Sequence, residues 1–432
     1  MSDGTGIAET MFGIRGVRVR DAHRTASELV LEVETTAEKA WCPSCRKPAE
    51  AQDRLVVEVR DMACFDRATR VRLAKRRWRC RRRGCAKRTW TEEVPGVLSR
   101  QVLTVRAGRE ATRQVGRYAR SVASVAAEFG VAWDTVMDAV VAHGTPLIQA
   151  RPTKVVRALG IDETSFLSAA ARRRTVYVTS LVDLDRRVLV DLIEGKSARD
   201  LRRWLGSRTG AQNRATKVVA LDLTETYRAG IVPHLSHATC VADPFHVVRV
   251  ANRCVDQVRR RVQNETLGHR GRKLDPLYKI RKLLLKGAER LDEQGHERLL
   301  LGLRIGDPYD ELLGAWLAKE SVRDVYLTED PAKAALLLDK AIAGCRADSV
   351  PEIRALGRTL ERWRQEILNH HRTGASNGPT EGNNFCIKQI KRASRGMTNF
   401  EHYRLRVLLH AGGVEWPSTP APPPIRRSVA PQ

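Results

Sequence analysis

The stretch that decides the fold is Val155-Val156-Arg157-Ala158-Leu159-Gly160-Ile161-Asp162-Glu163, an apolar run that ends abruptly in a carboxylate. Such a run predicts a buried strand that delivers Asp162 to the rim of a sheet. A strand-end aspartate can also simply cap the turn that follows it, and this stretch alone favours neither interpretation. The strands and acids found elsewhere in the sequence decide between a site residue and a turn cap.

Four more strand-like runs follow Asp162, at residues 175–182, 187–193, 217–222 and 239–243. The first three strands predict an antiparallel meander, and helices precede the fourth and fifth. The order β-β-β-α-β-α-β is that of the ribonuclease-H-like fold, in which the first and fourth strands are neighbours. Asp162 and Asp222 then come together, and two close carboxylates repel unless a cation lies between them. Hard oxygen ligands favour Mg²⁺ (or Mn²⁺) there.

Residues 249–372 show helical patterns, and we expect an all-α insertion that interrupts this α/β domain. A Gly/Ser/Asn-rich loop then leads into a helix whose first turn carries Glu381. Lys388 and Arg392 follow on the same stripe of that helix, which suits a metal bound beside a DNA backbone. Taken alone, Glu381 is better explained as an acid that stabilises the start of its helix.

Two cysteine pairs lie near the N-terminus, in Trp41-Cys42-Pro43-Ser44-Cys45 and in Cys80-Arg81-Arg82-Arg83-Gly84-Cys85. Strand-like segments separate the pairs, and four thiolates at this spacing can surround a structural Zn²⁺, as in a zinc ribbon. The alternative is a set of reduced cysteines that simply pack. The nine cysteines form an odd number, which fits a reducing cytoplasm better than a disulfide framework.

Residues 67–88 contain twelve Lys or Arg and no acid, with Trp78 within the run and Trp90 just after it. This pattern predicts a face that binds DNA phosphates, because solvated charged faces usually mix the two signs. A solvated face is the alternative. The residues expected to contact DNA here are Arg76, Arg77, Arg79, Arg81 and Arg82.

Residues 121–140 show the spacing of a helix-turn-helix, with Gly130 suited to the left-handed position of the turn. The second helix would then be the recognition helix, with Trp133 and Thr135 at its start. An ordinary helical hairpin is the alternative. The arginine triplet 259–261 in the insertion has two equally supported interpretations, as phosphate contacts or as a solvated helix face.

The charge of the whole chain agrees with a polyanionic partner. It carries 76 Lys and Arg against 50 Asp and Glu over 432 residues, a formal net charge of +26. In a soluble protein such a surplus usually serves nucleic acid. No apolar run is long enough to span a membrane, and the N-terminus lacks the pattern of a secretory signal. We therefore expect a cytoplasmic, nucleoid-associated protein.

Together these features resemble a bacterial insertion-sequence transposase of the ISL3 family, over about residues 41–409. The stretches that carry the resemblance are Leu159-Gly160-Ile161-Asp162-Glu163, Ala220-Leu221-Asp222, Ala242-Asp243-Pro244-Phe245-His246-Val247-Val248 and Ser376-Asn377-Gly378-Pro379-Thr380-Glu381-Gly382-Asn383-Asn384.

The resemblance implies a catalytic DDE triad of Asp162, Asp222 and Glu381, which would hold two Mg²⁺ ions. Whether Asp222 or Asp243 is the second ligand is ambiguous, and strand order favours Asp222. Asp243 and His246 would then support the metal ligands or contact the scissile strand. The implied reaction is hydrolysis at the transposon end, followed by attack of the freed 3′-hydroxyl on target DNA.

The resemblance also implies double-stranded DNA as partner, both transposon ends and target, bound by a homodimer or higher oligomer. A non-enzymatic DNA-binding regulator derived from a transposase is the main alternative, and a nuclease of the same fold is a third. The domain boundaries that we expect are a zinc ribbon at residues 1–95, a helix-turn-helix domain at 96–152, the catalytic domain at 153–248 and 373–415, the insertion at 249–372 and a disordered tail at 416–432.

Overall fold

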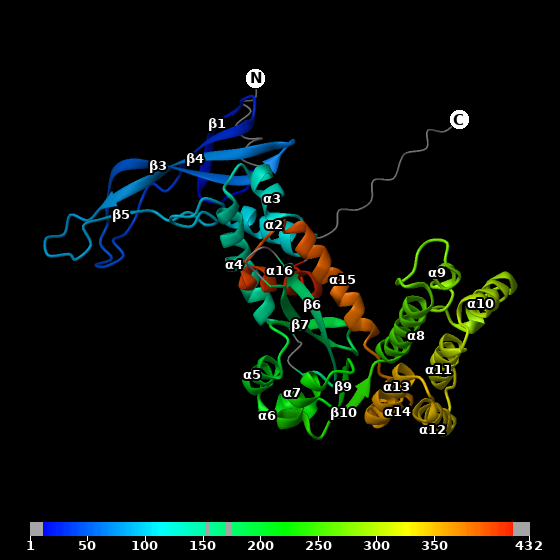
Figure 1. The fold of residues 1–432 in the computed structure, drawn as a ribbon. Helices are drawn as coiled ribbons and strands as arrows, with labels where there is room; N and C mark the ends of the chain where they lie inside the picture. Colours follow the sequence, from blue (N-terminus) through cyan, green and yellow to red (C-terminus); the bar gives the residue numbers. More distant parts are fainter. Residues whose placement is uncertain (1–11, 152–154, 170–173, 418–432) are drawn as a thin grey trace, which may run out of the picture. The chain divides into compact units, whose positions relative to one another are not determined.

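The computed structural model describes residues 12–151, 155–169 and 174–417, so the expected tail lies, from residue 418 on, outside the described residues. The fold is mixed α/β, with two sheets and many helices (Figure 1). The chain divides into two compact units, one formed by residues 1–151 with 386–432 and the other by residues 152–385. Among the described residues, no helix combines the length and apolarity needed to cross a bilayer.

The sheet of residues 152–385 has the strand order β10-β9-β6-β7-β8. Strands β6, β7 and β8 form the predicted antiparallel meander, and β9 pairs parallel to both β6 and β10. The predicted contact between the first and fourth strands is therefore confirmed. The strands are β6 (Ala158–Leu167), β7 (Val176–Asp183), β8 (Val188–Glu194), β9 (Val218–Leu221) and β10 (Thr239–Ala242).

Strand β6 does not end at Asp162, as the apolar run predicts, but continues to Leu167. The reason lies in its two neighbours. The parallel partner β9 pairs with β6 only as far as Gly160, whereas the antiparallel partner β7 stays paired to Leu167. Asp162 therefore lies just past the point where β9 stops, and the rim of the sheet is made by the end of β9.

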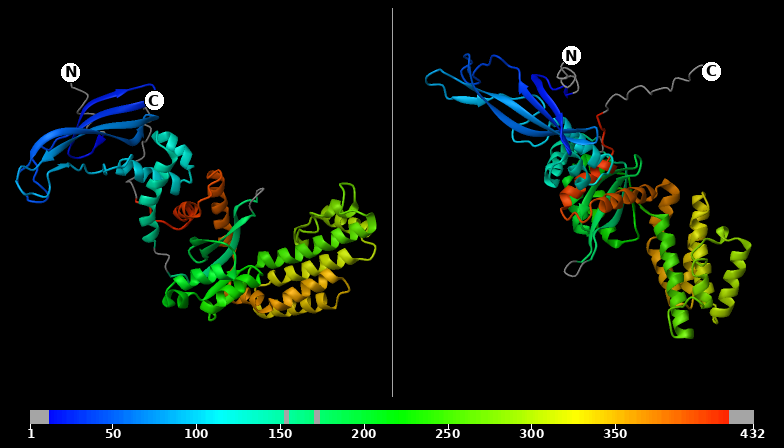
Figure 2. Two further views of the ribbon diagram at one scale, coloured as in Figure 1. Left: turned by 60° about the vertical axis from the view of Figure 1, so that its left-hand side comes forward. Right: turned by 90° about the horizontal axis from the view of Figure 1, so that it is seen from above.

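Helices α5 (Ala198–Ser207), α6 (Gly210–Ala215) and α7 (Glu225–Leu235) connect β8, β9 and β10. A long helical segment follows, in which α8 packs along α11 and α12 along α13 (Figure 2). It shares one apolar core with the sheet. Its members are α8 (Pro244–Leu267), α9 (Pro276–Ile280), η1 (Ala288–Arg290), α10 (Glu293–Gly306), α11 (Glu311–Tyr326), α12 (Pro331–Ala347), α13 (Pro351–Arg362) and α14 (Arg364–Thr373).

The arginine triplet of α8 belongs largely to this packing. Arg259 is buried and pairs with Asp256, and Arg261 bonds to Glu311 of α11 and Glu352 of α13. Those carboxylates raise the pKa of the Arg261 guanidinium. Neither interpretation from the sequence fits these two side chains: Arg259 is buried beside Asp256 of its own helix, and Arg261 is paired with acids from distant parts of the chain.

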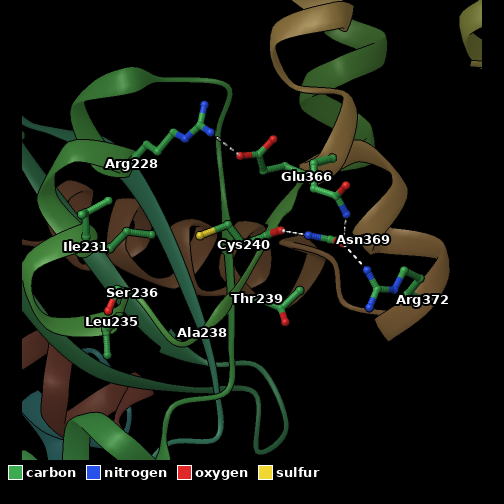
Figure 3. A pocket seen from close by; sticks show the side chains of 12 residues that line it. Arg228, Ile231, Leu235, Ser236, Ala238, Thr239, Cys240, Glu366, Asn369 and Arg372 are labelled. Carbon is green, nitrogen blue, oxygen red and sulfur yellow. Dashed lines mark hydrogen bonds and ion pairs between the residues drawn. The ribbon is translucent and has the colours of Figure 1, made fainter. Parts of the chain in front are cut away.

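Helix α14 covers the edge of the sheet, along β10. Asn369 donates a hydrogen bond of 2.8 Å to the Cys240 carbonyl, which an uncovered edge strand would leave unpaired. A cavity of about 300 Å³ lies beside this contact. Figure 3 shows that Glu366 and Arg228, 3.0 Å apart, form an ion pair at this cavity. Glu366, the acid that lines this cavity, is separate from Asp222 and Asp243, which follow β9 and β10.

The sheet of the other unit has the order β1-β2-β4-β3, with β5 paired to β4. The two strand-like runs between the cysteine pairs are the middle of a much longer hairpin, β3 and β4. The strands are β1 (Val17–Arg24), β2 (Glu28–Thr35), β3 (Glu50–Cys64), β4 (Arg67–Arg79) and β5 (Thr89–Thr91). Apolar side chains of β1, β2, β3 and β4 form its core.

The basic run of β4 is partly neutralised by its neighbours in the sheet. Arg70 pairs with Glu28 of β2 at 2.5 Å, and Arg77 pairs with Asp53 of β3. The predicted all-basic face is therefore wrong in part, because Glu28 and Asp53 lie among its arginines. Acids that are absent from the local sequence are supplied by adjacent strands.

The helices of the same unit include α2 (Val105–Gly116), α3 (Val122–Phe129) and α4 (Trp133–Gln149). The turn between α3 and α4 has Gly130 in the left-handed region at φ 63°, as predicted. Helix α16 (Phe400–Ala411) packs against α2 and α4. Helix α15 (Gly378–Ala393), which carries Glu381, runs from one compact unit into the other.

We predict that Gly160→Ala destabilises the protein. A Cβ at Gly160 would lie 2.2 Å from Oγ1 of Thr380 and 2.7 Å from Oδ1 of Asn377, both on buried side chains. Overpacking of this kind costs about 1–3 kcal/mol. Urea denaturation measures the change in the free energy of unfolding.

Gly382→Ala is the matched control, because nothing lies within 4 Å of its Cβ position in α15. Alanine there should stabilise the helix by about 0.5–1 kcal/mol. If Gly160→Ala were as stable as the parent, the close approach of α15 to β6 would be refuted.

Candidate active site

Four elements bring five ionisable side chains together within residues 152–385. Asp162 belongs to β6, Asp222 follows β9, Asp243 and His246 follow β10 at the start of α8, and Glu381 lies in the first turn of α15. The parallel strands β9 and β10 end at the same edge of the sheet, which places the residues after them side by side. Their ligand atoms form two groups that share His246. Asp162, Asp222 and His246 form one group, and Asp243, His246 and Glu381 the other, each within 4.8 Å.

The imidazole of His246 lies between two carboxylates. Its Nδ1 is 2.8 Å from Oδ1 of Asp222 and 3.0 Å from Oδ2 of Asp243. Burial lowers the pKa of His246, but the two carboxylates outweigh this and raise it to about 9. The ring is therefore an imidazolium at neutral pH. The single Nδ1–H bonds to Asp243, and the buried Oδ1 of Asp222 has no hydrogen bond within the described part of the chain.

Asp162 is the most perturbed acid of the set. Burial and the nearby charge of Asp222 raise its pKa to about 6. One oxygen accepts the backbone N–H of Glu163 at 2.7 Å, and the other accepts Nδ2 of Asn384 at 2.6 Å. The side chain is thus held in one orientation beside another carboxylate, in a setting that disfavours its own charge.

Asp243 is built into the scaffold. It caps α8 by accepting the His246 backbone N–H, and it accepts the Asn377 backbone N–H at 2.7 Å. Burial raises the pKa of Asp243, but the bonds from His246 and Asn377 leave it below its usual value. Both of its oxygens are therefore committed to protein donors.

Glu381 is the most exposed of the five. Partial burial and the charge of Asp243 raise its pKa. The structure groups it with Asp243 and His246, and its carboxylate is not in the same 4.8 Å group as Asp162 and Asp222. The predicted pair Asp162 and Asp222 is therefore brought together directly, and Glu381 lies beside it across His246.

Sequence reasoning gave no role to three polar residues of this site. Asn384 links Asp162 to the buried hydroxyl of Ser180, which donates to Oδ1 of Asn384 at 2.9 Å. Arg249, one turn after His246, lies 3.4 Å from Oδ2 of Asp222. A serine within the apolar run of β7 was the available signal for Ser180. The asparagines of the loop pattern gave no such signal, because their partners lie about 200 residues away in the sequence.

The side chains present fit a hard divalent cation. The carboxylates of Asp162 and Asp222 converge, with Glu381 beside them across His246. One buried oxygen of Asp222 lacks a hydrogen bond, and burial together with the Asp222 charge raises the pKa of Asp162. A bound cation would satisfy the oxygen and remove the repulsion, and oxygen ligands are those that Mg²⁺ and Mn²⁺ prefer.

The predicted cysteine cluster is also formed. Sγ of Cys42 lies 3.7 Å from that of Cys85, the Cys45 and Cys80 sulfurs are also 3.7 Å apart, and all four lie within 4.8 Å. Four sulfurs at about 2.3 Å from a tetrahedral Zn²⁺ would be about 3.8 Å apart, whereas a disulfide is about 2.05 Å long. Backbone N–H groups of Cys45 and Ser44 lower the pKa of Cys42 to about 7. The arrangement suits a tetrahedral thiolate site.

The residues predicted to contact DNA lie on the β3–β4 hairpin and the chain that follows it, on α4 and on α15. In the β-rich module, the Arg76 guanidinium lies over the Trp78 ring, Arg77 and Arg81 pair with acids, and Arg79 and Arg82 are exposed. The remaining candidates lie on helices: Trp133 and Thr135 in the first turn of α4, and the exposed Lys388 and Arg392 on α15.

The comparisons with known proteins point to one family. The family model of ISL3 transposases, described as "Transposase", matches residues 159–407. The chain is 24% identical over 410 residues to the transposase for insertion sequence element IS1001 of Bordetella parapertussis, covering 93% of this chain and 97% of that protein. It is 29% identical over 294 residues to the transposase for IS1557 of Mycobacterium tuberculosis, covering 62% and 63% of the two chains.

We predict that Asn384→Leu destabilises the fold more at pH 7.5 than at pH 5. The raised pKa of Asp162, about 6, means that protonation of this acid favours the folded state. At pH 7.5 the variant buries an ionised carboxylate that has lost a donor, at a cost of about 1–3 kcal/mol. At pH 5 Asp162 is mostly neutral and the cost shrinks. Urea denaturation without added metal gives both values.

Asn383→Leu is the control, because this buried neighbour donates to the Arg187 and Pro379 carbonyls, which do not titrate. Its effect should not change between the two pH values. Equal pH dependence in both variants would contradict the role given to Asn384.

Proposed function

We propose, because this chain belongs to the ISL3 family of transposases, that it cuts DNA at the ends of an insertion sequence and joins them to target DNA in a divalent-metal-dependent reaction. The observation that carries the proposal is the group of Asp162, Asp222 and His246 at the edge of the sheet, with a buried carboxylate oxygen that has no donor.

Asp162, Asp222 and Glu381 are the proposed metal ligands of a ribonuclease-H-like catalytic domain. The two committed oxygens of Asp243 support Asp222, and not Asp243, as the second ligand. Divalent cations in such sites activate the attacking oxygen and stabilise the leaving oxygen of the phosphodiester.

The remaining residues of the site would prepare it for DNA. Asn384 orients Asp162, and the imidazolium of His246, anchored by Asp243, holds Asp222 in place. The exposed guanidinium of Arg249 lies where it can pair with a DNA phosphate beside Asp222. Each of these groups acts before the reaction, by fixing positions and charge.

The same proposal extends to the DNA-reading modules. The helix-turn-helix of α3 and α4 and the basic cysteine-bearing hairpin would bind the terminal inverted repeats, with Lys388 and Arg392 on the DNA backbone. We propose Zn²⁺ as the ion of the cysteine cluster. The domain boundaries expected from the sequence, and the action of two or more copies on DNA, belong to this proposal.

The test of the proposed function is cleavage and strand transfer of DNA that carries the element's ends, with Mg²⁺ or Mn²⁺. We expect Asp222→Asn and Asp162→Asn to lose roughly 10³-fold or more in rate, because each removes a ligand worth several kcal/mol. Glu163→Gln is the control. That acid is next to Asp162 but pairs with Lys196, and its variant should keep activity.

Unchanged cleavage by Asp222→Asn would remove Asp222 from the site. Specific binding of the ends without cleavage by the parent would favour a DNA-binding regulator. Cleavage of branched DNA or RNA hybrids without strand transfer would favour a nuclease.

A second test concerns the cysteine cluster. Metal analysis of the purified protein should find one zinc ion per chain, and Cys45→Ser should lose it and unfold at a lower temperature. Cys64→Ser is the control, since Cys64 lies outside the cluster at the end of β3. A parent protein without zinc, or a Cys45→Ser variant that keeps it, would refute the site.

A further inference from the structure

A basic cleft lies between α9 and α10, within the helical segment and apart from the acids of the proposed active site. Its volume is about 740 Å³, in the range of about 300–1,000 Å³ typical of ligand pockets. Gly302 sets the approach of the two helices, because a Cβ there would lie 2.6 Å from the Ile280 side chain. The shape of the cleft therefore depends on the close contact of Gly302 in α10 with Ile280 in α9.

Four cations and no acid line this cleft. They are Lys273, Lys279, Arg281 and Arg298. Within the described residues, none of the four forms an ion pair with an acid. Other arginines of the same helical segment are paired, such as Arg261 with Glu311 and Arg364 with Asp339. An excess of unpaired positive charge in a concave site favours an anionic ligand.

The rest of the lining is apolar or aromatic. The Arg281 guanidinium lies 3.9 Å from the centre of the Tyr278 ring, and it also donates to the Tyr278 carbonyl at 2.8 Å. On the facing helix, Leu301 and Ile305 follow one another by one turn and are 58% and 63% exposed. Flat stacked groups and exposed aliphatic side chains therefore face the same space as the cations.

The combination points to one kind of occupant. A simple anion would use the cations alone, and duplex DNA presents phosphates while its bases stay stacked inside. An unpaired DNA strand offers phosphates for the lysines and arginines, and bare base faces for aromatic, guanidinium and aliphatic groups. A chain of this family acts on DNA, so the occupant is available to it.

We propose that the cleft between α9 and α10 binds unpaired nucleotides of a DNA strand. Lys279 and Arg298 contact the phosphates, and the bases pack on Leu301, Ile305 and the Tyr278–Arg281 pair. The helical segment is then a second DNA-binding surface. This inference needs only that the chain acts on DNA, and it does not depend on the roles proposed for the acids.

The experiment measures binding of labelled DNA to the full-length protein by fluorescence anisotropy. The probes are a single strand of about 12 nucleotides and the duplex of the same sequence. Divalent metal is omitted, so the result is independent of cleavage and of the proposed active site. Arg298→Glu tests the charge of the cleft, and Leu301→Ser tests its apolar side without changing charge.

We expect Leu301→Ser to weaken single-strand binding by about 5- to 100-fold, as loss of base contacts does elsewhere, and Arg298→Glu to weaken it through the lost phosphate contact. Both variants should change duplex binding much less. Arg298→Glu should also reduce the salt dependence of single-strand binding by roughly 0.7 in log–log slope or more. Arg304→Glu is the matched control, since this exposed arginine of α10 does not line the cleft.

Three results would overturn the proposal. The first is that Arg298→Glu and Leu301→Ser leave the affinity for the single strand unchanged. The cleft would then not bind DNA, and an acidic protein segment would be the next occupant to test. The second is an equal loss on duplex and single strand, which would reduce the cleft to backbone contact. The third is the same loss in Arg304→Glu, which would mean that net charge alone is responsible.

Discussion

The repulsion among the converging carboxylates is the constraint on which the arrangement of residues 152–385 depends. Asp162 and Asp222 come together beside the end of β9, and Asp222 and Asp243 meet at His246. Like charges this close destabilise the fold unless positive charge joins them. In the protein itself that charge is the His246 imidazolium, whose Nδ1 is within 3.0 Å of two of the acids. It leaves one Asp222 oxygen without a donor, and a divalent cation is the proposed complement.

The surrounding fold fixes the positions of these carboxylates in spite of their repulsion. The early end of β9 opens the sheet beside Asp162. Gly160, two residues earlier and therefore on the same face of β6, lets α15 approach closely. That approach brings Asn384 to Asp162 and the Asn377 backbone to Asp243. The loop and helix of residues 374–393 therefore supply the donors as well as Glu381, which explains why an acid so distant in sequence belongs to the site.

The parts that depend on local pattern could be predicted from the sequence. Strand-like runs predicted the meander, Gly130 predicted the left-handed turn, and the cysteine spacing predicted the sulfur cluster. Asp162 and Asp222 were also predicted to meet, because the order of the strands determines which ones are neighbours.

The parts that depend on distant partners could not be predicted in this way. The extension of β6 past Asp162 depends on β7, the neutralisation of Arg77 depends on Asp53 of another strand, and the role of Arg261 depends on α11 and α13. The asparagines of the site were missed for the same reason. An asparagine in a polar loop carries no sign of the carboxylate that it will meet, and the cleft of α9 and α10 exists only once the two helices pack.

The central claim is that the converging carboxylates form a divalent-metal site, and Mn²⁺ binding tests it most directly. Free Mn²⁺ is measured by electron paramagnetic resonance while zinc-loaded protein is added at pH 7.5. The parent protein is compared with Asp162→Asn, a variant that keeps the shape of the side chain. The account predicts that the parent removes the free Mn²⁺ signal stoichiometrically and that the variant binds at least about tenfold more weakly, a loss of about 1.4 kcal/mol. Equal Mn²⁺ binding by the two proteins would contradict it.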